Sequence, residues 1–294
     1  MTAVSALDRV GSRDPSFNTD FEARLRALRL NVGAQRVVRS RFGLGEDAEG
    51  MARLARFFRT PAWATGTVGM VDALFLYEMI RCVRPERVLE IGVGSGVSTA
   101  VALFAMAEIG APPMHADGLE TVQAFDILPH FYLDATKPIG AAAVEIAGGL
   151  ARGMRVHTGK GAAEAGAMFA GAPVSFAFID ADHKHPSPTA DVLALAPALK
   201  PGAWVALHDI ALAEVARVYA ERTGKPVKWA HHGAQWLFER WPYEKIAGVG
   251  GARNIGAIRM PETGSVGVEE LRELIDLPWE AEVPPEVRRT LGRP

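Results

Sequence analysis

The chain has 294 residues, a formal net charge of −2 at pH 7 and a hydrophobic fraction of 49%. This length and apolar content favour one buried core with appended segments over two equal domains. The near-neutral charge gives no electrostatic basis for binding nucleic acid. No apolar run is long enough to cross a bilayer and no secretory signal pattern is present, so we expect a cytoplasmic protein without membrane association.

The N-terminal region is basic and has the periodicity of helices. Phe21, Leu25, Leu28 and Val32 recur at helical spacing, with arginines among them. Such charge is usually the solvated face of an amphipathic helix. We therefore expect residues 1–66 to form a helical segment that caps the rest of the molecule or builds an interface between subunits.

An apolar strand that runs directly into alternate glycines is the most informative local pattern. The strand is predicted over residues 88–91, the glycines are Gly92, Gly94 and Gly96, and a helix is predicted from Ser98. Glycine lets the backbone turn sharply and approach a ligand closely. The N-terminus of the following helix directs free N–H groups into the same space. The third glycine is not five residues after the first, as a dinucleotide fingerprint requires, and this argues against NAD.

A second strand is expected over residues 119–127. Asp126 lies at its end and Glu120 at its beginning. In nucleotide-binding folds a carboxylate at the end of the second strand meets the ribose hydroxyls of the cofactor. Asp126 is therefore the favoured ribose ligand and Glu120 the reserve; the alternative is that Asp126 only caps the turn before Pro129.

Two further apolar runs, residues 174–179 and 204–207, have the composition of buried parallel strands joined by a crossover helix. In open parallel sheets the ligand lies off the carboxyl ends of the strands, so polar residues that follow two adjacent strands face one crevice. The polar residues that follow these two strands are Asp180, Asp182, His183, His208 and Asp209.

The remaining elements follow from periodicity and from glycine and proline breaks. The other predicted helices span residues 68–83, 98–109, 137–150 and 212–222. The other predicted strands span residues 154–158, 235–241 and 254–260.

The spacing Glu90-x-Gly92-x-Gly94-x-Gly96 resembles motif I of class I S-adenosylmethionine-dependent methyltransferases, in which an acid of the first strand precedes the glycine loop. The segment from residue 174 through Lys200-Pro201-Gly202 to His208-Asp209 is similar to the corresponding part of small-molecule O-methyltransferases. The resemblance implies a Rossmann-like, doubly wound, mostly parallel seven-stranded sheet with an antiparallel edge strand. It places the core at residues 67–262, between the N-terminal helical segment and an acidic C-terminal tail, residues 263–294.

The same resemblance implies a set of cofactor-binding residues. The turn at Gly159 would lie along the adenine of S-adenosylmethionine, and Asp180 beside its methionine portion. The full implied set is Glu90, Gly92, Gly94, Gly96, Ser98, Asp126, Gly159 and Asp180.

Methyl transfer to a hydroxyl requires in-line placement, exclusion of water and deprotonation of the acceptor. Sugar and catechol O-methyltransferases often hold Mg²⁺ with carboxylates at two strand ends, which Asp180 and Asp209 match, and the Asp180-x-x-His183 spacing is similar to that of macrolide-sugar enzymes. His208 departs from that pattern, because those enzymes have an acid there and imidazole is a poor Mg²⁺ ligand. Two mechanisms stay open: Mg²⁺ held by Asp180 and Asp209, or a metal-free site with His183 or His208 as the general base.

The sequence thus predicts an S-adenosylmethionine-dependent enzyme that methylates a hydroxyl of a small molecule. Two alternatives remain: another transferase on the same fold, moving a methyl group to nitrogen or an aminopropyl group, and a non-catalytic cofactor-binding scaffold. The expected partner is the small-molecule acceptor, and a homo-oligomer would form through the N-terminal helices.

Overall fold

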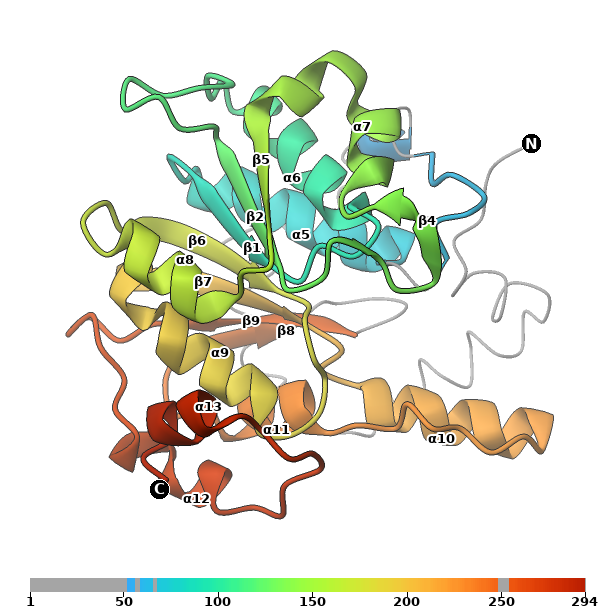
Figure 1. Ribbon diagram of the computed structural model, residues 1–294, viewed down its shortest axis with the longest axis vertical. Helices are drawn as coiled ribbons and strands as arrows, with labels where there is room; N and C mark the ends of the chain where they lie inside the picture. The colour runs from blue at the N-terminus through green and yellow to red at the C-terminus, as the bar shows by residue number, and fades with distance from the viewer. Residues whose placement is uncertain (1–51, 56–58, 66–67, 248–253, 294) are drawn as a thin grey trace.

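The computed structural model describes residues 52–55, 59–65, 68–247 and 254–293 (Figure 1). The N-terminal helical segment expected over residues 1–66, and any subunit interface that it would build, lie mostly outside these ranges. Among the described residues, no helix combines the length and apolar character needed to cross a membrane.

Seven strands form one sheet in the order β5-β2-β1-β6-β7-β9-β8. The first five are parallel, whereas β9 runs antiparallel to both β7 and β8. This arrangement confirms the predicted Rossmann-like, mostly parallel sheet. The strands are β1 (Val88–Ile91), β2 (Val122–Asp126), β5 (Met154–Thr158), β6 (Val174–Ile179), β7 (Leu199–His208), β8 (Lys245–Ala247) and β9 (Ile255–Arg259).

Helices cover both faces of the sheet because the strands are apolar on both faces. Along β6, Phe176 and Phe178 point into one core and Ala177 and Ile179 into the other. The first core is closed by α5 (Met70–Val83), α6 (Val97–Glu108) and α7 (Ala141–Ala147), and the second by α8 (Ala162–Phe169), α9 (Ser187–Leu195) and α11 (Gly233–Arg240) (Figure 1).

The C-terminal residues pack against the second core. The short helices α12 (Arg272–Ile275) and α13 (Pro285–Thr290) lie below α9 in Figure 1, with α13 beside α11. Leu271, Leu274 and Leu291 are buried there. The acidic residues of this segment therefore lie at its outer surface, and its apolar residues form part of the core.

Two sequence predictions of local structure were wrong. Residues 235–241 form helix α11 and its C-cap instead of a strand, because the buried pair Leu237 and Phe238 packs as a helical face on the second core. The helix expected over residues 137–150 is reduced to α7, since β4 (Asp134–Pro138) pairs with β3 (His130–Phe131) before it and a 3-10 turn, Gly148–Gly153, follows it. The predicted spans of β5 and β6 coincide with the observed strands.

Candidate active site

A cavity of about 740 Å³ opens at the carboxyl ends of β1, β6 and β7. The glycine loop after β1 forms one wall and the β3–β4 hairpin, with Phe131, Tyr132 and Leu133, forms another. The residues that follow β6 and β7 line it next to helix α10 (Leu212–Thr223) and Trp229. This is the edge at which open parallel sheets bind their ligands.

Two of the three loop glycines serve different purposes. A Cβ on Gly92 would lie 2.2 Å from the carbonyl oxygen of Asp180, so this glycine lets the ends of β1 and β6 pack against each other. A Cβ on Gly94 would meet nothing closer than the Phe131 ring, at 3.8 Å, and Gly94 lines the cavity. Both have positive φ angles, of 84° and 52°. Gly92 is therefore required by packing, whereas Gly94 leaves room beside the backbone for a ligand.

Asp126 stands at the carboxyl end of β2, and its carboxylate supports the glycine loop. Oδ2 accepts hydrogen bonds from the N–H groups of Val93 and Gly94, both at 3.0 Å, and Oδ1 accepts one from Leu128 at 2.8 Å. Glu120 lies before the start of β2, where Arg87 donates to its carbonyl oxygen. Of the two acids, only Asp126 lies at the ligand-binding end of the sheet.

Glu90 lies behind the loop and not in the cavity wall. Its side chain is 1% exposed, and its two carboxylate oxygens accept hydrogen bonds from the hydroxyls of Ser98 (2.5 Å) and Thr99 (2.6 Å). Burial raises the pKa of Glu90 to about 7, against the opposing effect of these hydrogen bonds. Glu90 thus ties β1 to the first turn of α6, while Ser98 also lines the cavity.

Gly159 has a φ of 70° and follows β5. The next residue, Lys160, donates its N–H to the carbonyl oxygen of Asp126 at 3.2 Å, so the turn after β5 joins the end of β2. Half of the eight predicted cofactor-binding residues line the cavity: Gly92, Gly94, Ser98 and Asp180. The other four do not: Glu90, Gly96, Asp126 and Gly159.

Acids and histidines from the ends of β6 and β7 meet at the floor of the cavity. Nδ1 of His208 lies 3.1 Å from Oδ1 of Asp180, and Nε2 of His183 lies 3.1 Å from Oδ2 of Asp209. Asp180, His183 and Asp209 each offer one ligand atom within 4.8 Å of the others, the spacing of a candidate metal site. The structure therefore brings together four of the five polar residues that the sequence placed after β6 and β7, and the fifth, Asp182, also lines the cavity.

A further acid reaches this cluster from α5. Asp72 is 1% exposed, and its Oδ2 lies 3.5 Å from Nε2 of His208. Sequence reasoning missed Asp72, although an acid between Val71 and Ala73 in an apolar helix is a visible signal. Asn254 was also missed; its side-chain amide donates a hydrogen bond to Asp209.

The carboxylates around His208 determine its protonation state. Burial by itself lowers the pKa of His208, but Asp180 and Asp209 outweigh burial and raise it well above its usual value. Conversely, burial raises the pKa of Asp180, and the neighbouring His208 cation outweighs this and lowers it. The neighbouring carboxylates therefore favour the imidazolium form of His208, which has no free lone pair with which to accept a proton.

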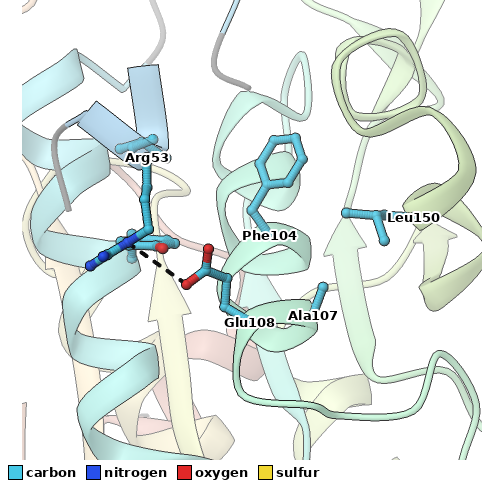
Figure 2. A pocket seen from close by; sticks show the side chains of 7 residues that line it. Arg53, Phe104, Ala107, Glu108 and Leu150 are labelled. Atoms are coloured by element: carbon cyan, nitrogen blue, oxygen red, sulfur yellow. Dashed lines mark ion pairs between the residues drawn. The ribbon is translucent and has the colours of Figure 1, made fainter. Parts of the chain in front are cut away.

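A second cavity, of about 230 Å³, lies at the other end of α6 (Figure 2). It is lined by Phe104, Ala107 and Glu108 of that helix, and Arg53 forms an ion pair of 3.9 Å with Glu108. The large cavity reaches Ser98 of α6 and the small one begins at Phe104, so roughly 9 Å of helix separates their lining residues, and the two cavities share none. The smaller cavity is therefore separate from the candidate active site.

Comparisons with known proteins agree with this architecture. Residues 89–210, from β1 to just past β7, match a family model described as a methyltransferase domain. A search of the curated proteins finds no match. This match and the order of the strands identify residues 89–210 as a methyltransferase domain.

Solved structures with similar chains include three O-methyltransferases. A putative O-methyltransferase from Klebsiella pneumoniae is 17% identical, with 78% of this chain and 96% of that chain covered and a TM-score of 0.46. The O-methyltransferase TomG from Streptomyces achromogenes, in complex with S-adenosylmethionine, is 18% identical over 78% and 96% of the two chains, with a TM-score of 0.45. An O-methyltransferase from Bacillus cereus, in complex with S-adenosylhomocysteine, is 18% identical over 77% and 97%, with a TM-score of 0.44.

Proposed function

We propose that this methyltransferase transfers the methyl group of S-adenosylmethionine to a hydroxyl group of a small molecule. The observation that carries the proposal is the meeting of Asp180, His183 and Asp209 on the floor of a cavity that the glycine loop also lines. The sulfonium methyl group is already activated, so the protein has to position the acceptor and remove its proton. A hydroxyl acceptor needs this proton removal, whereas a neutral amine attacks through its free lone pair.

On the cofactor side, Gly94 leaves open space at the loop and the N-terminus of α6 follows directly. Asp126 would meet the ribose hydroxyls through the lone pairs that the loop N–H groups leave free, because each carboxylate oxygen can accept more than one hydrogen bond. Ser98 and Asp180 would face the methionine portion. These assignments follow the position of each residue at the carboxyl edge of the sheet.

In one version of the mechanism, Asp180, His183 and Asp209 hold a divalent cation. The two carboxylates supply the oxygen ligands that Mg²⁺ and Mn²⁺ prefer, whereas the imidazole of His183 is a poor ligand for Mg²⁺. Such an ion would lower the pKa of a bound acceptor hydroxyl. Asn254, which donates to Asp209, and His208, which contacts Asp180, would orient the two carboxylates.

In the other version, His183 itself accepts the proton. Asp209 contacts Nε2 of His183 at 3.1 Å, which would fix the orientation of the ring and stabilise the imidazolium that forms. The side chain of His183 is 32% exposed at the cavity, so the acceptor can reach it. His183 takes part in both versions, and removal of metal distinguishes them.

The test measures release of S-adenosylhomocysteine across a panel of phenols, sugars and carboxylic acids, with EDTA, Mg²⁺ or Mn²⁺. If a cation is held at the site, EDTA stops turnover and Mg²⁺ or Mn²⁺ restores it. If His183 is the base in a metal-free site, EDTA has no effect and His183→Ala lowers the rate by roughly 10² to 10⁴ while cofactor binding survives. His115→Ala, outside the cavity lining, is the control variant.

Three results would count against the proposal. Full activity of His183→Ala in EDTA would defeat both versions of acceptor activation. Uptake of NADH in place of S-adenosylmethionine would overturn the cofactor assignment. Transfer to amines alone would move the function to N-methylation.

A further inference from the structure

The loop that carries His183 connects β6 to α9, and residues from the C-terminal segment hold it in place. Glu280 lies next to this loop although it belongs to the segment that follows the sheet. We propose that Glu280 is a positioning residue that fixes the His183 loop, so that acceptor activation depends on a part of the chain outside the strand and helix framework of the methyltransferase domain. The inference rests on the proposed function for its catalytic consequence, but its structural part can be tested alone.

The side chain of Glu280 joins the loop to the start of α11. Its Oε2 accepts hydrogen bonds from the backbone N–H groups of His185 (2.8 Å) and His232 (3.0 Å), and its Oε1 lies 2.7 Å from Nδ1 of His232. The backbone N–H of Glu280 donates to the carbonyl oxygen of His185 at 2.8 Å. With a longer contact of 3.2 Å from the His232 N–H to Oε1, five polar contacts connect Glu280 to two other parts of the chain.

Glu280 is ionised in this setting. Burial raises the pKa of its carboxyl group, but the hydrogen bonds from His185 and His232 outweigh burial and lower it. Hydrogen bonds to a charged acceptor are stronger than those between neutral groups. The carboxylate therefore holds two backbone N–H groups that would otherwise need other partners.

The loop is held from a second direction by Gly233, the first residue of α11. Its N–H donates to the carbonyl oxygen of His183 at 2.9 Å. A Cβ at this position would lie 2.7 Å from the same oxygen and 2.8 Å from the His185 nitrogen, so only glycine permits this approach. The His185 ring is fully buried and packs edge-on against Trp236, with ring centroids 5.3 Å apart.

These contacts act on the backbone of His183 and its neighbours, while the His183 side chain extends to Asp209. None of the hydrogen-bond partners of Glu280 belongs to the glycine loop or to β2. If Glu280 is removed, His183 should therefore lose its fixed position relative to Asp209 while the cofactor side of the cavity stays in place. A residue with a general structural role would weaken both sides together.

The first experiment measures hydrogen exchange of the full-length protein without added ligand. In Glu280→Ala the amides of residues 183–185, 187 and 232–233 should exchange faster, while the amides of β1 and β2 keep their wild-type protection. Glu280→Gln retains one acceptor oxygen and should give intermediate protection. Glu282→Ala, an exposed acid two residues away, is the matched control and should leave exchange unchanged.

The second experiment measures binding and turnover of the same variants. Glu280→Ala should lower kcat by about 10- to 100-fold, which is the usual effect of losing a group that orients a ligand. If the wild-type protein binds Mn²⁺, the affinity for Mn²⁺ should fall by a similar factor. The Kd for S-adenosylhomocysteine should stay at the wild-type value. Glu280→Gln should recover part of the loss. Gly233→Ala, which pushes the loop from its other side, should reproduce the same selective pattern if Glu280→Ala does not fold.

Unchanged exchange at residues 183–187 in Glu280→Ala would overturn the inference, as would a parallel loss of cofactor affinity. Failure of the proposed function has a different signature. In that case the wild-type protein transfers no methyl group to any acceptor of the panel, and the exchange experiment still decides whether Glu280 holds the loop.

Discussion

Asp126 combines two tasks in one carboxylate. It accepts the N–H groups of Val93 and Gly94, which shapes the glycine loop, and it occupies the position from which a ribose is bound in nucleotide folds. Glu120, the other acid considered for this role, lies before β2 begins, near Arg87. The two acids therefore offer a direct test of the cofactor assignment.

We expect Asp126→Ala to weaken binding of S-adenosylhomocysteine by roughly 1 to 3 kcal/mol, because the ribose hydroxyls and the loop N–H groups lose their acceptor. Glu120→Ala should have a smaller effect. Isothermal titration calorimetry of both variants measures the two losses. The opposite order would transfer the ribose role to Glu120.

Burial changes the pKa of Glu90, which lies outside the cavity lining and connects β1 to the first turn of α6. Its pKa is raised to about 7, so the folded state binds a proton more tightly than the unfolded chain does. The resulting stabilisation is fully present below the unfolded pKa of about 4.5 and is lost as the pH rises through about 7.

Between pH 4.5 and pH 8, wild-type protein should therefore lose about 3 kcal/mol of unfolding free energy relative to Glu90→Gln, which does not titrate. Urea unfolding of both proteins at several pH values measures this difference, and the other titrating groups cancel in the comparison. A difference that stays constant with pH would contradict the raised pKa.

At the scale of elements, the packing of β1 against β6 and the turn from β1 into α6 require close approach of the backbone at particular glycines. Gly92 stands where the loop crosses the carbonyl oxygen of Asp180, and Gly94 stands where the loop faces the cavity. The same residue type thus serves packing at one position and ligand access at the other. This difference is invisible in the motif, where the two glycines look equivalent.

The matched pair Gly92→Ala and Gly94→Ala should separate these roles. Gly94→Ala should cost about 1 to 2 kcal/mol of stability, the cost of a left-handed conformation for a residue with a Cβ, and should weaken cofactor binding because the methyl group enters the ligand space. Gly92→Ala should destabilise the fold by more than this, since its Cβ would lie 2.2 Å from backbone. Thermal unfolding and calorimetry together measure both effects, and equal stability of the two variants would contradict the packing role of Gly92.

At the scale of the whole molecule, the C-terminal segment completes the second core. Leu271, Leu274 and Ile275 are buried against the face of the sheet that α9 and α11 cover. Trp279 and Glu280 follow four and five residues after Ile275, so the packing of these apolar residues brings Glu280 to the His183 loop. The acidic end of the chain is thereby connected to the candidate active site.

Local patterns in the sequence determined much of the fold. The mainly apolar strands β1 and β6, the glycine spacing and the helix after it depend on contacts within a few residues, and their positions were predicted from the local sequence pattern. The strand ends also predicted that Asp180, His183, His208 and Asp209 would share one crevice, because parallel strands end at the same edge of a sheet.

Only the tertiary structure decided which distant groups meet. The run Trp236-Leu237-Phe238 suits a strand or a helix, and packing on the second core made it α11. Asp72 reaches His208 from α5, and Glu280 reaches His185 from the C-terminal segment. Their pairing depends on how helices and loops far apart in the sequence pack together, and short-range periodicity carries no information about such contacts.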